Sequence, residues 1–276
     1  NYQFIARTKL VAAIEYFGSL LFWSLGSLVR ATYVPATFSE TAVLTTSSWN
    51  VTVLSNNISI LSGFSVVQYN QLVFWVGNGQ FYVFNGAVGR LQNYMCNNWF
   101  FDGINQQQKS KIYSWLNEQY DAIWFMYARD GHVENNACVI YNVGREVWYD
   151  STIARSCAVT LNTFRNPVLA SSEIVSSVTP SNTILNSYPI WKHESGLNKV
   201  IGSAVEAIQT YVEYPIFDLF TSQPSPNTNV LVETTRIEPD FIINEGMFVT
   251  IRNRMFAQET PIDTGPIEFD GTTKFI

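Results

Sequence analysis

Only two side chains of this chain titrate near neutral pH, and each has a simple structural interpretation. His193 precedes Glu194 in the stretch WKHESG, and an imidazole beside a carboxylate can relay a proton. The same two residues also fit a hydrogen-bonded pair that positions a loop, and we favour that interpretation. His132, in RDGHVEN, is expected in a solvent-facing hairpin turn rather than at a catalytic centre.

Two carboxylates in the last third of the chain form the other candidate for chemistry. Asp240 in RIEPDF, which begins with Arg236, and Asp270 in FDG would suit glycoside hydrolysis, in which two carboxylates flank the scissile bond. Isolated carboxylates in an acidic segment are usually solvated. The chain has no G-x-S-x-G elbow, no H-E-x-x-H and no Gly-rich phosphate loop. We therefore expect no catalytic residues, no cofactor and no metal site, and we interpret His193, Glu194, Arg236 and Asp240 as loop or interface residues.

The three cysteines predict free thiols. Cys96, Cys138 and Cys157 are odd in number and show no C-x-x-C spacing, which indicates reduced, buried thiols made in a cytosol rather than disulfides or a zinc site. The glycosylation sequons at Asn50 and Asn57 lie in a segment rich in Asn, Ser and Thr, where such matches arise by chance.

The charge distribution argues against a nucleic-acid binder. Residues 1–189 contain ten acidic and ten basic side chains, whereas residues 190–276 contain twelve acidic and six basic ones. A protein that binds DNA through its phosphates normally carries a basic stripe. Sequence-specific DNA recognition is therefore not expected.

Residues 10–29, LVAAIEYFGSLLFWSLGSLV, raise the question of a membrane helix, because twenty residues with one charge can cross a hydrocarbon core of about 30 Å. A repeat argues against that. The stretches VVQYNQLVFWVGNGQFYVFNG and NEQYDAIWFMYARDG can be laid over IEYFGSLLFWSLGS, with Tyr16, Tyr69 and Tyr120 in register. A period near fifty residues is typical of a repeated supersecondary unit. The repeated aromatic positions are Tyr16, Phe22, Trp23, Tyr69, Phe74, Trp75, Tyr120 and Phe125.

The second copy predicts the local structure of all three. VFWVGNGQFYVF is two apolar runs around a Gly-Asn-Gly turn, so the first copy is expected to form strands at 11–16, 20–25 and 28–34 with no membrane span. CVIYNVGR after the third copy echoes YVFNGAVGR of the second. We expect one short helix in FDGINQQQKSKIYSWLNEQY, capped by Asp102, and a surface loop at 166–187.

Units of this size with several short strands predict an all-β chain of the β-propeller type. We expect residues 1–189 to hold the blades, with copies near 10–34, 66–90 and 117–150. Residues 190–276 are expected to add acidic strands that continue the propeller or form a closing or interface region. Because the chain starts at Asn1 and ends in GTTKFI, we expect a piece of something longer. The remaining blades have either diverged in sequence or lie outside this chain.

Several blocks in order resemble the tail hub or nozzle proteins of short-tailed bacteriophages, also called phage stabilisation or packaged-DNA stabilisation proteins. The blocks are FWVGNGQFYVFNG, FFDGINQQQKSKIYSWLNEQYDAIWFMYA, ENNACVIYNVGREVWYDSTIARS, IWKHESGLN and RIEPDF, and they span roughly residues 65–276. This chain has FMYARDG where an aromatic-aromatic-Pro run is more usual, and it stops at TTKFI where such proteins generally continue.

The resemblance implies a propeller-based subunit of a ring, commonly six-fold, below the portal and adaptor proteins. Such a ring extends the DNA channel, retains the packaged genome and anchors distal tail fibre or needle proteins. The resemblance also implies a virion tail protein that is made in the host cytoplasm. It implies that viral DNA passes through the ring without specific binding. The alternative is a carbohydrate-binding or glycan-hydrolysing propeller at the virion tip.

Overall fold

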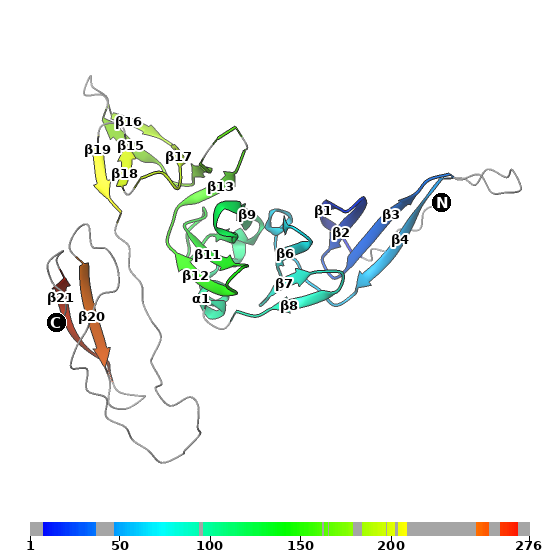
Figure 1. Ribbon diagram of the computed structural model, residues 1–276, viewed down its shortest axis with the longest axis horizontal. Helices are drawn as coiled ribbons and strands as arrows, with labels where there is room; N and C mark the ends of the chain where they lie inside the picture. Colours follow the sequence, from blue (N-terminus) through cyan, green and yellow to red (C-terminus); the bar gives the residue numbers. More distant parts are fainter. Residues whose placement is uncertain are drawn as a thin grey trace, which may run out of the picture. The chain divides into compact units, whose positions relative to one another are not determined.

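The chain is mostly β-strand, arranged in antiparallel sheets (Figure 1). The computed structural model describes residues 8–36, 47–93, 96–161, 163–164, 166–178, 184–196, 198–201, 204–208, 247–253 and 260–269. The chain divides into two compact units, Asn1–Thr210 and Tyr211–Ile276.

Three four-stranded sheets follow one another along the first unit, and in each the strands are neighbours in the order in which the chain makes them. The first sheet contains β1 (Leu10–Tyr16), β2 (Ser19–Ser24), β3 (Leu28–Val34) and β4 (Ser48–Ser55). The second contains β5 (Val67–Tyr69), β6 (Leu72–Val76), β7 (Phe81–Phe84) and β8 (Val88–Leu91). The third contains β9 (Tyr113–Asn117), β10 (Ala122–Tyr127), β11 (Ala137–Asn142) and β12 (Val147–Ser151).

Smaller sheets and short helices complete the described chain. A fourth sheet has the order β13 (Arg155–Val159), β14 (Val168–Ser171) and β17 (Ile190–Lys192). Hairpins are formed by β15 (Val175–Val178) with β16 (Ile184–Ser187), by β18 (Asn198–Ile201) with β19 (Ala204–Ala207), and by β20 (Met247–Asn253) with β21 (Ile262–Phe269) in the second unit. The helices are α1 (Asn97–Gly103) and the 3₁₀ turns η1 (Gly63–Ser65), η2 (Gln106–Lys111) and η3 (Glu118–Tyr120).

The strands expected in residues 10–34 are confirmed. Phe17 and Gly18 both have positive φ, 47° and 70°, which is the two-residue hairpin turn whose twist matches that of the flanking strands. Gly79, in the Gly-Asn-Gly turn between β6 and β7, has φ 75°. Among the described residues, no helix is long and apolar enough to cross a membrane.

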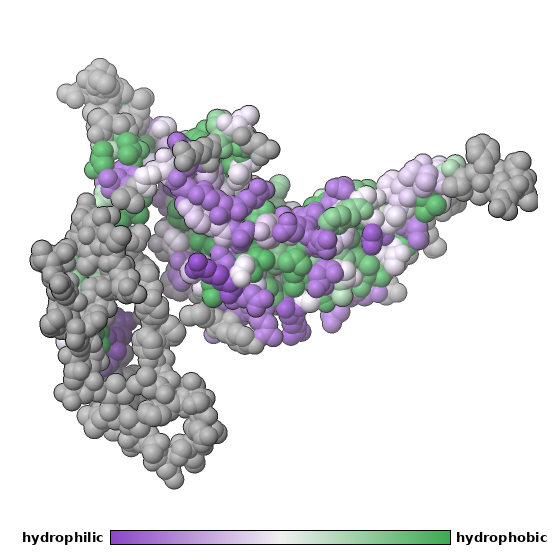
Figure 2. Space-filling view, viewed as in Figure 1, coloured by the Kyte–Doolittle hydropathy of each residue, from purple (hydrophilic) through white to green (hydrophobic). Residues whose placement is uncertain are grey.

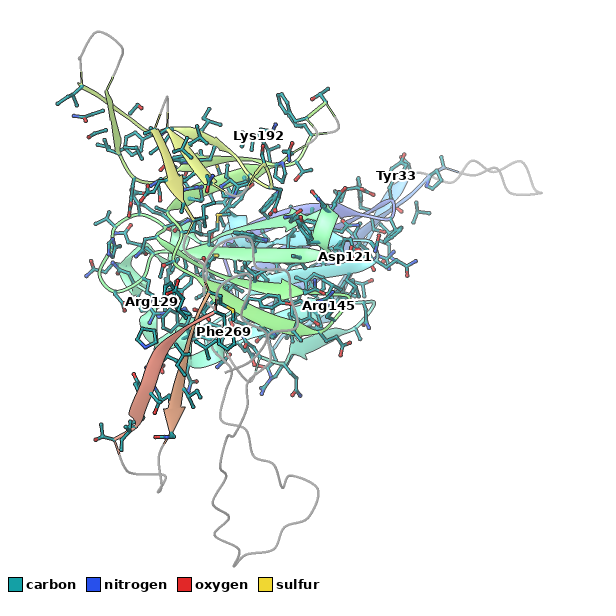
Figure 3. The ribbon with its side chains drawn as sticks, turned by 60° about the vertical axis from the view of Figure 1, so that its left-hand side comes forward. Tyr33, Asp121, Arg129, Arg145, Lys192 and Phe269 are labelled. Carbon is teal, nitrogen blue, oxygen red and sulfur yellow. The ribbon has the colours of Figure 1, made fainter. Side chains whose placement is uncertain are left out.

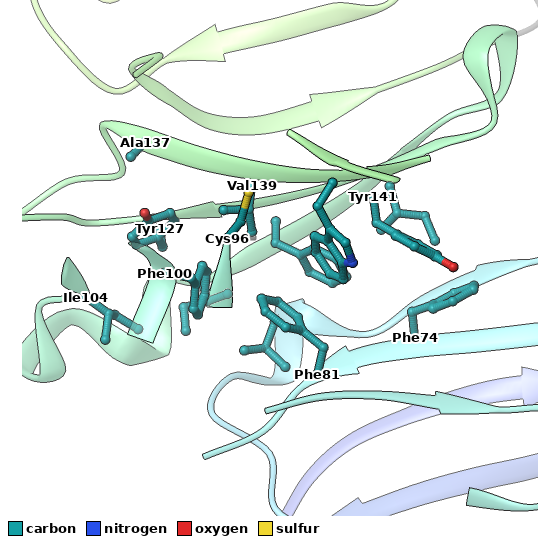
Figure 4. Packing of buried hydrophobic residues seen from close by; sticks show 14 residues of the cluster. Phe74, Phe81, Cys96, Phe100, Ile104, Tyr127, Ala137, Val139 and Tyr141 are labelled. Carbon is teal, nitrogen blue, oxygen red and sulfur yellow. The ribbon is translucent and has the colours of Figure 1, made fainter. Parts of the chain in front are cut away.

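The sheets pack face to face through apolar clusters. Trp23 of the first sheet and Trp75 of the second meet in one cluster. Phe74 and Phe81 of the second sheet pack with Phe125 of the third in another, which α1 closes from one side (Figure 4). Met126 of the third sheet packs against the fourth. Strands β6 and β10, each of which contributes to two clusters, are therefore buried along nearly their whole length.

The Phe-Trp pairs of the first two sheets do not occupy equivalent positions. Ser19, Leu72 and Ala122 are the first residues of β2, β6 and β10, each paired with the end of the preceding strand. Counted from there, Phe22 matches Trp75, so the Phe-Trp pairs are shifted by one residue relative to each other. A shift of one residue turns a side chain to the other face of its sheet. Trp23 and Trp75 consequently meet across one interface.

Three further expectations were wrong. Residues 113–117 form β9 rather than part of a helix, because they pair with β10. Asp102 does not cap a helix N-terminus, since it lies near the C-terminal end of α1. Residues 166–187 are not one loop, since β14, β15 and β16 lie there. The division into blades at 1–189 and further strands at 190–276 stays a prediction; the two compact units divide at 210/211, and β17 pairs with β14 inside the first unit.

Candidate functional site at the turns between sheets

The first turn of each sheet is tied to the sheet before it by one side chain. The Tyr16 hydroxyl, at the end of β1, donates to the backbone oxygen of Gln71, 3.0 Å away in the β5–β6 turn. The Tyr69 hydroxyl, at the end of β5, donates to Asp121 Oδ1 in the β9–β10 turn. The two bonds are equivalent, and they fix the turns of successive sheets to each other.

Another residue links the third sheet to the turn that follows β17 of the fourth sheet. Asn117, not Tyr120, is the last residue of β9 before the turn, and its amide donates to Glu194 Oε1 at 3.2 Å. Tyr120 lies in η3 within the turn and is 49% exposed. The expected equivalence therefore holds for Tyr16 and Tyr69, whereas Tyr120 is displaced because the β9–β10 turn is longer than the other two.

Asp121, in the β9–β10 turn, is bonded both to the end of β5 in the second sheet and to the β11–β12 turn of its own sheet. It has φ 50°, and its backbone oxygen accepts a hydrogen bond from the N–H of Val143 at 2.8 Å. Figure 3 shows Asp121 and Arg145 at the same end of the sheet, with Arg129 at the opposite end. The hydrogen bond to Asp121 raises the pKa of the Tyr69 hydroxyl, so the tyrosine stays a proton donor.

His193 is paired with an arginine rather than with its neighbour Glu194. Arg155 Nε donates to His193 Nε2 at 2.9 Å, and the Arg155 guanidinium lies 5.0 Å from the centre of the Trp191 ring. Burial, together with the Arg155 charge, lowers the pKa of His193 to about 4. The imidazole is therefore neutral and accepts a hydrogen bond at neutral pH, which suits a positioning residue and not an acid catalyst.

Glu194 holds the adjoining turn together. It has φ 53°, its carboxylate accepts the Asn117 amide, and its backbone oxygen accepts the Asn166 amide at 2.5 Å. A hollow of about 350 Å³ lies beside it, lined by Gln119, Asn166, Lys192, Glu194 and Ser195. The expected hydrogen bond between His193 and Glu194 is not the one the structure shows, because His193 pairs with Arg155 and Glu194 with Asn117.

A second hollow, of about 790 Å³, lies between the first turns of sheets one and two. Its lining residues are Phe17, Gln68, Asn70, Gln71 and Leu72. Tyr16 fixes the two turns against each other through its bond to Gln71.

The remaining candidates are exposed or lie elsewhere. His132 is exposed in the turn between β10 and β11, as expected. Arg236, Asp240 and Asp270 lie outside the described residues, so the proposed carboxylate pair has no geometry to report. In the part of the chain that the structure describes, no three His, Cys, Asp or Glu side chains gather as metal ligands would.

All three cysteines are free thiols, but only two are buried. Burial raises the pKa of Cys96 to about 11 and raises that of Cys138 further. Cys157 is exposed on β13, contrary to expectation, because its side chain alternates with that of buried Ala158.

Sequence reasoning missed Arg155, Asp121 and Phe17. The positions of Arg155 and Asp121 follow from pairings 38 and 52 residues apart, which no local pattern carries. Phe17 had a detectable signal, because a bulky residue immediately before Gly18 in a two-residue turn is unusual.

The comparisons with known proteins assign no family to this chain. The scan against protein-family models found no match, and the search of curated proteins found no similar sequence.

Proposed function

We propose that the chain is a structural virion protein, a ring-forming tail hub or nozzle subunit of a short-tailed bacteriophage. In this role it extends the DNA channel below the portal and adaptor, retains the packaged genome and anchors distal tail parts. The basis in sequence is the ordered set of blocks similar to that family. The basis in structure is the succession of sheets and the apolar surface at one end of that succession.

The sheets support a propeller-type arrangement. Each of the first three is a four-stranded meander, and neighbours pack face to face with an equivalent hydrogen bond between their turns. Trp75 and Phe125 occupy one position in their sheets, and both pack toward the preceding sheet. Phe22 has the same position in the first sheet.

An exposed aromatic pair carries the proposal of subunit contact. Tyr33 on β3 and Trp49 on β4 are 48% and 42% exposed, with ring centroids 5.4 Å apart. Val34, beside them, is also exposed. Hydrophobic residues reach the surface among hydrophilic ones along the sheets (Figure 2). Clustered exposed aromatics are typical of protein interfaces.

Assembly of purified chain tests this role. We expect light scattering after size exclusion to give a defined oligomer, and we expect Tyr33→Ser with Trp49→Ser to shift it toward monomer. Phe64→Ser, which changes an exposed aromatic of η1, is the matched control and should leave the oligomer intact. A wild-type chain that stays monomeric at high concentration contradicts the proposal.

A further inference from the structure

Phe17 occupies a backbone conformation that suits other residues better. Its φ of 47° lies in the left-handed region, which Gly, Asn and Asp adopt most readily and in which a bulky side chain is strained. The corresponding position of the second sheet, directly after Tyr69, holds Asn70, with φ 53°. The first sheet therefore has an aromatic residue where the second has an asparagine.

The side chain of Phe17 stays largely exposed, so burial does little to offset this backbone strain. The Phe17 side chain is 59% exposed, and its ring packs against that of Tyr16 in a T-shaped arrangement, with centroids 4.8 Å apart. Strained residues held in place by their surroundings cluster at functional sites. An exposed aromatic kept at a strained position indicates a role in contact with a ligand.

The hollow beside Phe17 defines the chemistry of that ligand. Gln68, Asn70 and Gln71 line it with amide groups that can both donate and accept hydrogen bonds, and Leu72 adds apolar surface. None of the lining residues is charged. Glu15, the nearest acid on the turn, accepts the Gly18 N–H at 2.8 Å. The Tyr16 bond to Gln71 holds the aromatic and the amides in a fixed relation.

We propose that this hollow is a binding site for a neutral carbohydrate. A sugar ring presents C–H groups that pack on an aromatic ring and hydroxyls that pair with amides, and the volume of about 790 Å³ lies within the range of small-molecule sites. The absence of charge in the lining disfavours phosphorylated and acidic sugars. This inference goes beyond the structural role proposed above and does not depend on it.

The decisive variant is Phe17→Asn, because it separates ligand contact from structure. It creates an Asn-Gly turn, the preferred sequence for this hairpin geometry. We expect the melting temperature to rise by about 2–4 °C. We expect affinity for the best ligand among maltohexaose, cellohexaose, mannohexaose and chitohexaose to fall by about tenfold or more, measured by titration calorimetry and saturation-transfer NMR.

Two further variants complete the test. Gln71→Ala removes an amide but keeps the backbone oxygen that Tyr16 uses, so it should weaken binding without loss of stability. Phe64→Asn changes an aromatic that is 68% exposed in η1 and should bind like wild type. Binding to none of the four sugars, equal binding by Phe17→Asn, or equal loss in Phe64→Asn would overturn the proposal. So would dissociation of an oligomer by Phe17→Asn with sugar affinity unchanged, which would make Phe17 a subunit contact.

Discussion

Trp23 of β2 and Trp75 of β6 meet edge to face across the first interface between sheets, with ring centroids 5.6 Å apart and ring planes at 70°. Both side chains are fully buried. They join two sheets that share no strand, so this contact holds successive sheets together rather than strands within a sheet.

Replacing Trp23 with Ala should therefore destabilise the chain by about 3–5 kcal/mol, as for other large buried aromatics. Equilibrium unfolding in urea measures this loss in the free energy of unfolding.

Phe substitutions at Trp23 and Trp75, singly and together, should show a coupling of about 0.5–1.5 kcal/mol between the two rings. Strict additivity would mean that the rings do not interact in solution.

Tyr16→Phe removes one inter-sheet hydrogen bond and little else. The hydroxyl is the only atom lost, and the Gln71 oxygen that accepts it remains. We expect a loss of about 0.5–1.5 kcal/mol in the free energy of unfolding. Tyr149→Phe, at an exposed tyrosine of β12, is the control and should be neutral. Equal effects of the two substitutions would contradict the assigned role.

His193 predicts a pH dependence of stability. Its pKa is about 4 in the folded chain and near 6.5 when unfolded, so the unfolded chain takes up the proton first as pH falls. The stability associated with neutral His193 is complete above about pH 6.5 and is lost as pH drops toward about 4. His193→Gln keeps an acceptor for Arg155 and does not titrate. The difference in urea midpoint between wild type and this variant should change across that range, and parallel curves would refute the assignment.

The three thiols should react very differently. Cys157 is exposed and should be labelled rapidly by a thiol reagent in the folded chain, whereas Cys96 and Cys138 should react only after unfolding. Mass spectrometry of labelled peptides distinguishes them. Rapid labelling of Cys138 in the native chain would show that the interface between the third and fourth sheets opens readily.

Charge predicts that the chain does not hold DNA by affinity. The net charge is −6, and residues 1–189 are balanced. We expect negligible binding to duplex DNA in a mobility-shift assay even at low salt, since there is no source for the salt dependence that phosphate contacts produce. Tight, salt-sensitive binding would contradict a conduit that retains DNA by closing sterically.

The sequence predicted the strands of residues 10–34 and the fifty-residue period, because alternation and turn glycines are local signals. With Tyr16 and Tyr69 in register, the repeats already place Phe22 at the position of Trp75. The sequence could not predict that Trp23 and Trp75 would then meet across one interface between sheets. Similarly, WKHESG placed His193 beside Glu194, but the folded chain brings in Arg155 from another strand. Tyr113–Asn117 looked helical because five residues are too few to separate the two periods.

The most direct test of the account is electron cryo-microscopy of the assembled chain, alone and in particles. The account predicts a closed ring around a central channel that is sterically closed before ejection, with Tyr33 and Trp49 buried between subunits. It also predicts that particles lacking the chain package DNA and then lose it. A chain that forms no ring, or full genome retention in particles that lack it, would contradict the central claim.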